Sequence, residues 1–289
     1  MYKLRLLNFY VPSNEKLVEL DLKHSLVEKL WNGVQDLVNL KLLYLDGCKH
    51  LIELPDLSLA SKLEEVHLDD CTSLLHVPSS ILSLDSLFAL NLRGCKELRY
   101  IQSEKQSRSL KCLNLRGCSR LVKYSVISEK LEYLNLDDTA IEELPSLVIG
   151  LYCSIQLLDW PKLEKLPATF DSSLSITSLC LDNCLNLSEL PDNLGLLSNL
   201  NKLSLRGSNI ENLPGSIKYL SQLRDLNVSN CRRLRSLPEL PLFLKDLNAS
   251  NCISLETVSS LGISVLKHSF EFLQELNASN CISLETVST

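Results

Sequence analysis

The amino-acid sequence predicts an α/β solenoid, in which short coils of chain stack side by side and line one face with a parallel sheet. Two observations lead to this fold class. The phrase L-x-x-L-x-L-x-x-C recurs along the chain, as in Leu40–Cys48, Leu87–Cys95 and Leu110–Cys118, and many copies are followed by a Leu-Pro pair. A chain that repeats one phrase throughout builds an extended surface and leaves few residues for a catalytic centre.

The spacing of the copies identifies the repeat. Between Leu17 and Leu244, successive copies begin 21 to 24 residues apart. This period and wording are typical of the leucine-rich repeat, so we expect a leucine-rich-repeat horseshoe over residues 1–289. The thirteen copies begin at Leu4, Leu17, Leu40, Leu63, Leu87, Leu110, Leu131, Ile155, Ile176, Leu200, Leu223, Leu244 and Leu273.

The two ends of the array differ from its middle. Residues 1–39 hold the N-terminal repeats, and residues 243–289 hold two almost identical C-terminal repeats. Phe243–Ser260 matches Phe272–Thr289 at an offset of 29 residues, which indicates a local duplication. Solenoids usually carry polar capping units. Since neither end resembles one, we expect fraying, or a missing neighbour, at both ends, as in a fragment or a truncated gene product.

Each coil should contribute one short strand to the concave face. In L-x-x-L-x-L the last two leucines alternate with polar residues, which is the pattern of a strand with one buried side. A single coil cannot bury its leucines alone, so its neighbours must cover them. We therefore expect leucines such as Leu90 and Leu113 in the core, and the x positions on the concave surface.

The Leu-Pro pairs define the opposite, convex side. Proline lacks an N–H group and fixes its φ angle, so it prevents a long helix at that place. The residues that follow, such as 79–81 and 215–217, suit an extended segment or a short helical turn. We expect a convex side that is mostly irregular, with short helices.

The cysteines follow the repeat. Eight of the eleven occupy the position after the strand that we call the turn slot, and Thr139 and Ser208 take it in two other coils. In this repeat the slot holds a small buried group that hydrogen-bonds to the backbone turn. The eight are Cys48, Cys71, Cys95, Cys118, Cys184, Cys231, Cys252 and Cys281.

Composition and motifs argue against catalysis and against several classes of partner. The formal net charge is −6 and no basic stripe is present, so we expect no nucleic-acid binding. No apolar run reaches the roughly 20 residues that span a bilayer. The sequence has no phosphate-binding glycine loop, no H-E-x-x-H and no C-x-x-C motif. We predict no enzyme activity, no catalytic residue, no cofactor and no metal.

The compartment follows from the same features. Free thiols at buried slots indicate a reducing environment, and the first residues do not form a secretory signal. We therefore expect a cytoplasmic protein, with a nucleocytoplasmic distribution as the alternative.

Partner binding should use the outward x positions of the strands. Tyr44 and Tyr133 are expected to be exposed aromatic residues on a rigid face, where such side chains favour contacts. The full set of candidates is Tyr44, His67, Arg93, Arg116, Tyr133, Asp137, Asp159 and Arg206.

The charges on these positions have two interpretations. Asp69, Arg93, Arg116 and Asp137 follow one another in successive coils. They can form a self-compensated ladder of ion pairs, each worth about 0–1 kcal/mol. Alternatively, the two arginines form a charged patch that is ready for a partner protein.

The amino-acid sequence of the first repeats resembles that of a known family. Met1–Leu7, Leu17–Leu22, the phrase Glu28-Lys-Leu-Trp31-Asn-Gly33 and Leu51–Ser58 resemble the repeat domain of plant TIR-type nucleotide-binding leucine-rich-repeat disease resistance proteins. The resemblance covers essentially the whole chain. Its most specific parts are the Leu-Trp-x-Gly phrase and the Leu-x-x-Cys-x-x-Leu turns.

This resemblance implies a function. Such repeats sense a pathogen effector or a guarded host protein, and they contribute to autoinhibition through contact with a nucleotide-binding module. The family's NAD hydrolase activity resides in a TIR domain. This sequence contains no TIR or nucleotide-binding domain, so no catalytic residue is carried over. Two alternatives stay open: a stand-alone scaffold or ubiquitin-ligase substrate adaptor, and an extracellular receptor domain, for which a signal peptide and paired capping cysteines would be expected.

Overall fold

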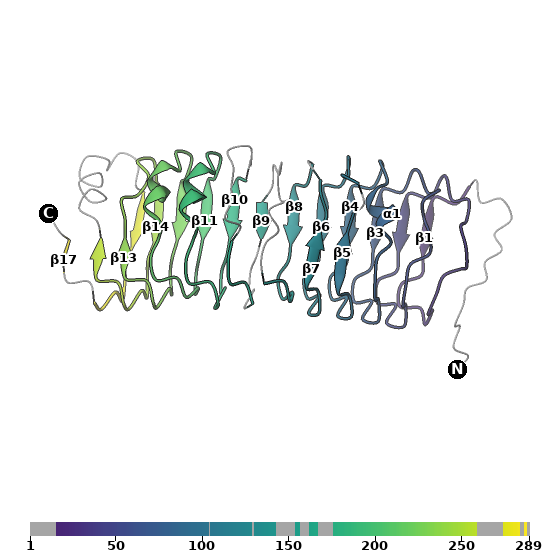
Figure 1. Ribbon diagram of the computed structural model, residues 1–289, viewed down its shortest axis with the longest axis horizontal. Helices are drawn as coiled ribbons and strands as arrows, with labels where there is room; N and C mark the ends of the chain where they lie inside the picture. The colour runs from purple at the N-terminus through teal and green to yellow at the C-terminus, as the bar shows by residue number, and fades with distance from the viewer. Residues whose placement is uncertain are drawn as a thin grey trace. The chain divides into compact units, whose positions relative to one another are not determined.

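The chain folds into two units of stacked coils. The computed structural model describes residues 16–103, 105–128, 130–142, 154–156, 162–166, 176–258, 274–283 and 286–287. The described residues up to 141 belong to unit 1, and those from 142 onward belong to unit 2. In each unit a three-residue strand recurs once per coil, and all paired strands are parallel (Figure 1). The predicted parallel solenoid is confirmed.

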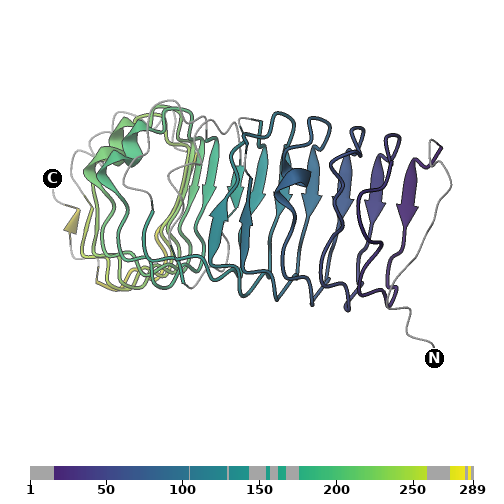
Figure 2. The same ribbon diagram turned by 45° about the vertical axis from the view of Figure 1, so that its right-hand side comes forward.

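Unit 1 carries a main sheet and a second, smaller one. The main sheet contains β1 (Glu19–Asp21), β2 (Leu42–Tyr44), β3 (Glu65–His67), β4 (Ala89–Asn91), β6 (Cys112–Asn114) and β8 (Tyr133–Asn135), in this order. Equivalent positions lie opposite each other, as Leu43 does to Val66 and Val66 to Leu90. The strands lie side by side in Figure 2. The second sheet pairs β5 (Tyr100–Gln102) with β7 (Lys123–Ser125).

Unit 2 repeats this plan. Its main sheet contains β9 (Ser154–Gln156), β10 (Ser178–Cys180), β11 (Lys202–Ser204), β12 (Asp225–Asn227), β14 (Asp246–Asn248) and β16 (Glu275–Asn277). A second sheet holds β13 (Ser236–Leu237), β15 (Thr257–Val258) and β17 (Thr286–Val287). Asp246 lies opposite Glu275, so the two nearly identical C-terminal segments stack as successive coils in register.

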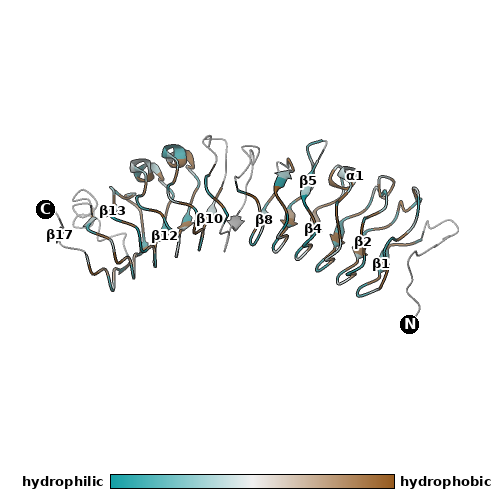
Figure 3. Cartoon of the chain, turned by 60° about the horizontal axis from the view of Figure 1, so that its bottom comes forward, coloured by the Kyte–Doolittle hydropathy of each residue, from teal (hydrophilic) through white to brown (hydrophobic). Residues whose placement is uncertain are grey.

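The leucines of the repeat form the core. Leu43, Leu45, Leu90 and Leu113 are completely buried. Hydrophobic and hydrophilic residues alternate along the coils, as Figure 3 shows by colour. Full burial of a leucine side chain contributes about 1.5–3 kcal/mol, so stability is distributed over many coils instead of being concentrated in one centre.

Each main-sheet strand whose following residues are described is followed by a turn through the left-handed region of backbone conformation. The residue before the turn slot has a positive φ angle, between 54° and 73° in the coils that carry it. Glycine, asparagine and aspartate tolerate this conformation best, and they fill nearly all of these positions. The positions are Gly47, Asp70, Gly94, Gly117, Asp138, Asn183, Gly207, Asn230, Asn251 and Asn280.

The side opposite the main sheets contains only short helices in the described residues. They are α1 (Ser79–Leu82), η1 (Asp192–Leu196) and η2 (Gly215–Tyr219), and each directly follows a proline. Helical turns at 79–81 and 215–217 are confirmed, whereas the second strand in some coils was not expected. No helix in the described part of the chain has the length and apolar character needed to span a bilayer.

Candidate functional site

The outward side chains of β1 to β8 in the main sheet form what we call the sheet face of unit 1. Along each strand the middle residue points into the core, and its neighbours point outward. The outward set includes the second residue after the strand, such as Arg93 after β4 and Arg116 after β6. Arg93 and Arg116 are exposed, while Tyr44 and His67 are half-buried.

An aromatic stack occupies the first coils of this face. The rings of Tyr44 and His67 have centroids 5.0 Å apart, and Lys23 Nζ lies 4.1 Å from the centroid of the Tyr44 ring. His67 Nε2 lies 2.9 Å from Glu65 Oε2. Contacts of a cation with an aromatic face contribute about 0.5–1 kcal/mol at exposed sites. Tyr44 is therefore held between neighbouring coils, and it is not the freely exposed aromatic side chain expected from the sequence.

The lysines of this face pair across neighbouring coils. Lys41 Nζ lies 2.6 Å from Glu64 Oε1, and Lys111 Nζ lies 2.7 Å from Glu132 Oε1. Lys23 Nζ similarly lies 3.8 Å from Asp46 Oδ2. Each pair is partly exposed and contributes about 0–1 kcal/mol. Each of the three lysines therefore already has an acidic partner within the protein.

The two arginines of this face, Arg93 and Arg116, have no such acidic partner among the residues that the structure describes. Their backbone N–H groups donate to side chains on their own strands, Arg93 to Asn91 Oδ1 at 3.4 Å and Arg116 to Asn114 Oδ1 at 3.1 Å. Within the described residues, neither guanidinium group makes a hydrogen bond or an ion pair. The ladder of ion pairs through Arg93 and Arg116 is therefore wrong, because the side chains extend into solvent instead of bonding to the aspartates beside them.

Asp69 lies one coil before Arg93. Its backbone N–H donates to Asp46 Oδ1 at 3.0 Å, and its own Oδ1 is buried without a hydrogen-bond partner. Burial and the nearby Asp46 carboxylate raise the pKa of Asp69, while Arg93 partly opposes the rise. Asp69 is half-buried and makes no ion pair among the described residues.

The side chains of Tyr133 and Asp137 are more buried than the sequence predicts. Asn135 Nδ2 donates to Tyr133 Oη at 3.1 Å, and the Asp137 backbone N–H donates to Asn135 Oδ1 at 2.9 Å. These bonds run along one strand and hold the tyrosine over it, leaving Tyr133 half-buried. Asp137 is only 2% exposed, so the prediction that it belongs to the outward charged surface is wrong.

Two further candidates lie in unit 2. Arg206 is exposed, and its backbone N–H donates to Asp182 Oδ1 at 3.0 Å. Asp159 is outside the described residues, and its predicted alignment is wrong. Gln156, not Asp159, lies opposite Cys180, because Ile155 takes the middle position of β9 opposite Leu179. The segment around Ile155 contains several apolar residues, which allowed a register that differs by three.

The cysteines of the turn slot link neighbouring coils. Seven of their thiols donate to a strand-end carbonyl of the preceding coil, at 2.9 to 3.2 Å. For example, Cys71 Sγ donates to Leu45 O and Cys95 Sγ to Leu68 O. Thr139 and Ser208 instead donate to the turn of their own coil. The seven cysteines are Cys48, Cys71, Cys95, Cys118, Cys231, Cys252 and Cys281.

Burial makes these thiols poor nucleophiles. It raises the pKa of Cys71, Cys118 and Cys252 to about 12, and that of Cys95 well above its ordinary value. The thiolate is the reactive form. Cys184, the eighth slot residue, is buried, with Sγ 3.9 Å from Asp182 O. The described residues contain no group of three or more His, Cys, Asp and Glu side chains suited to a metal ion.

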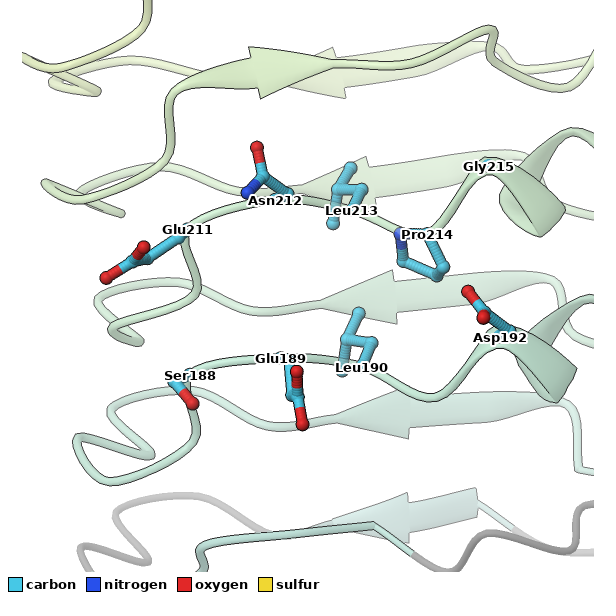
Figure 4. A pocket seen from close by; sticks show the side chains of 9 residues that line it. All are labelled: Ser188, Glu189, Leu190, Asp192, Glu211, Asn212, Leu213, Pro214 and Gly215. Carbon is cyan, nitrogen blue, oxygen red and sulfur yellow. The ribbon is translucent and has the colours of Figure 1, made fainter.

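A depression of about 520 Å³ lies in unit 2, between two successive coils that lead into η1 and η2 (Figure 4). Its carboxylates come from Glu189, Asp192 and Glu211. Arg233 already forms an ion pair with Glu211. Among the described residues, no hydrogen bond joins the Ser188 hydroxyl to one of these carboxylates, and we assign no chemistry to the depression. It is lined by Ser188, Glu189, Leu190, Asp192, Glu211, Asn212, Leu213, Pro214 and Gly215.

Comparison with known proteins supports the assignment of leucine-rich repeats and shows which proteins are similar to the chain. Residues 16–35 match a family model described as Leucine Rich Repeat. The chain is 39% identical to disease resistance protein RML1B of Arabidopsis thaliana over 258 residues, which is 89% of this chain and 22% of that protein. It is 36% identical to disease resistance protein RPP5 of the same plant, over 78% of this chain and 14% of that protein.

The chain is a leucine-rich-repeat protein related to plant disease resistance proteins. The predicted resemblance to the repeat domain of the TIR-type nucleotide-binding members is confirmed. The chain spans less than a quarter of the length of these relatives. Among solved structures, a leucine-rich-repeat protein from Bacteroides ovatus covers 85% of this chain with 73% of its own length, at 14% identity and a TM-score of 0.38.

Proposed function

We propose that this chain is the protein-recognition part of an intracellular plant immune receptor, and that it senses a pathogen effector or a guarded host protein through the sheet face of unit 1. The observation that carries the proposal is the pair Arg93 and Arg116, which are exposed just after two neighbouring strands and have no ion-pair partner among the described residues. Guanidinium groups in this state can form strong bidentate bonds with carboxylates of another protein. Arginine is also one of the residues that most often dominate binding energy.

The role in immunity is supported by the relatives, which are disease resistance proteins. In the proposed receptor the repeats contribute to autoinhibition through contact with a nucleotide-binding module, and they work in the cytoplasm or between cytoplasm and nucleus. The repeat region itself binds protein and performs no chemistry, which is consistent with buried, protonated thiols.

The test is made in the plant with the native gene product. Arg93→Ala/Arg116→Ala is compared with Arg99→Ala/Lys123→Ala, which removes two positive charges at and beside the second sheet of unit 1. Each variant is co-expressed with a collection of pathogen effectors, and cell death and protein abundance are scored. We expect the first variant to lose an effector response that the second retains, at equal abundance. Equal responses from both variants and the native protein would overturn the assignment of this face.

Autoinhibition has a separate readout. If unit 1 also restrains a nucleotide-binding module, some substitutions on its surface will cause cell death in the absence of any effector. A scan of the exposed charged residues of unit 1 that yields no such self-active variant would remove this part of the proposal.

A further inference from the structure

We infer that the partner presents an α-helix to the sheet face of unit 1, and that this helix carries a basic residue at position i and acidic residues at i+3 and i+7. The inference rests on the proposed function and names the structural class of the partner. It is based on three residues in successive coils, Asp69, Arg93 and Arg116, which we call the charged row.

The charges of the row are fixed by the structure. Asp69 follows β3, Arg93 follows β4 and Arg116 follows β6, and these strands are neighbours in the sheet. Both guanidinium groups lack ion-pair partners in the described part of the chain, and the half-buried Asp69 makes no ion pair there either. A complementary partner therefore presents one cation followed by two anions.

The spacing of the row selects a helix. Neighbouring strands lie about 4.8 Å apart, so the three residues span roughly 10 Å. In an α-helix, residues i, i+3 and i+7 lie on one side at rises of about 4.5 and 10.5 Å. An extended chain places same-side residues about 6.7 Å apart, so its third side chain would lie roughly 13 Å from the first. A helix therefore matches the spacing of the row more closely than an extended chain that runs along it.

The surroundings of the arginines leave room for a helix. The neighbouring outward residues on their strands are Asn91 and Asn114, and the residues that follow the arginines are Gly94 and Gly117. These are small residues on both sides of the two long side chains. Within their own coils, the arginines have no bulky outward neighbour that a helix would first displace.

The test uses designed peptides and the purified chain at low ionic strength, where screening is weakest. The probe is an alanine-rich helix of about 18 residues, long enough to be helical in water, with Lys, Glu and Glu at i, i+3 and i+7. A second helix carries Glu, Lys and Lys at the same positions. A third peptide carries the original three charges at alternate positions of a proline-containing, extended chain. Binding is measured by fluorescence anisotropy.

We expect the first helix to bind the native chain about ten-fold more tightly than either other peptide, a difference of about 1.4 kcal/mol. Arg93→Glu/Arg116→Glu should reverse the preference between the two helices. Arg99→Glu/Lys123→Glu, with the same change in net charge, should leave it unaltered. Circular dichroism confirms that each variant is folded. All four side chains are solvent-exposed, so their substitution should leave the free energy of unfolding nearly unchanged.

Three outcomes would overturn the inference: no saturable binding of the first helix, a preference of less than about three-fold, which is within roughly 0.7 kcal/mol, or equal binding of the extended peptide. None of these results would affect the experiment with effectors in the plant, because that experiment does not depend on the shape of the partner. Loss of effector response in Arg93→Ala/Arg116→Ala together with failure of the helix probe would keep the recognition face and reject the helix.

Discussion

The Oδ1 atom of Asp70 lies 2.3 Å from the position that a β-carbon on Gly94 would occupy. Both residues have positive φ angles, of 56° and 72°, at equivalent turns of neighbouring coils. The same relationship joins Asn183 to Gly207, where the distance is also 2.3 Å. The side chain of one turn thus fills the space over the glycine of the next turn, so the residue types of successive coils depend on each other.

This contact predicts a specific cost for Gly94→Ala. A β-carbon adds strain of about 1–2 kcal/mol at a positive φ angle, and here it must also displace Asp70. Gly117→Ala is the matched control, because Gly117 has a φ angle of 73° but its nearest neighbouring atom would lie 3.6 Å away. We expect Gly94→Ala to lower the urea midpoint more than Gly117→Ala. The double variant Asp70→Gly/Gly94→Ala should recover the difference, and equal midpoints for the two single variants would contradict the contact.

The buried thiols predict a loss of stability in alkali. Burial raises the pKa of Cys118 to about 12 from its ordinary value of 9.0, and Cys118 Sγ donates to Leu92 O at 3.2 Å. Between these pH values the unfolded chain loses the thiol proton while the folded chain keeps it. The free energy of unfolding therefore falls as the pH rises.

Cys118→Ser removes this titration and retains a hydrogen-bond donor. We expect the native chain to lose about 1–3 kcal/mol more stability than Cys118→Ser between pH 8.5 and roughly 11, since one pKa unit corresponds to about 1.4 kcal/mol. Lysine and tyrosine titrate in both proteins, so they cancel in the comparison. Parallel stability curves would show that the thiol ionises equally well in the folded state.

The sequence predicts the stacking of coils well because each leucine obeys a local rule. The alternation around Leu90 and Leu113 gives the strand, the side that is buried and the parallel sheet, and all three are confirmed. It also places Arg93 and Arg116 on the outward side, since that position follows from the same alternation.

Features that depend on contacts between coils could not be predicted from the sequence. The slot of Cys71 is visible in the repeat, but its acceptor, Leu45 O, belongs to the previous coil. Asp137 is buried, and the hydrogen bonds that join Tyr133, Asn135 and the Asp137 backbone are not encoded by the repeat spacing. Around Ile155 the apolar pattern fits two registers, and only pairing with Leu179 selects one of them.

The unpaired arginines predict a neutral effect on stability. Arg93 and Arg116 are exposed and make no ion pair within the described residues, so Arg93→Ala/Arg116→Ala should change the free energy of unfolding by less than about 0.5 kcal/mol. Chemical denaturation at low and at high salt provides the measurement. A salt-sensitive loss of more than about 1 kcal/mol would revive the self-compensated ladder.

The asparagines at the turns of unit 2 form a ladder that gives a final prediction. Asn251 Nδ2 donates to Asn230 Oδ1 at 3.2 Å, and Asn280 Nδ2 donates to Asn251 Oδ1 at 2.8 Å. Asn251 also has a φ angle of 60°. The residue therefore serves two purposes: its side chain joins three coils, and its backbone adopts a conformation that most residues avoid.

Two substitutions separate these contributions. Asn251→Gly keeps the backbone conformation and loses both side-chain bonds, so it should cost about 0.5–2 kcal/mol. Asn251→Ala also loses the bonds, and it keeps a β-carbon at positive φ without the polar side chain that lets asparagine tolerate this conformation, so it should cost about 1–2 kcal/mol more than Asn251→Gly. Glycine would thus be the less damaging substitution, although it has the more flexible unfolded chain. If urea denaturation finds the alanine variant as stable as the glycine variant or more so, then the left-handed turn does not determine the residue at this position.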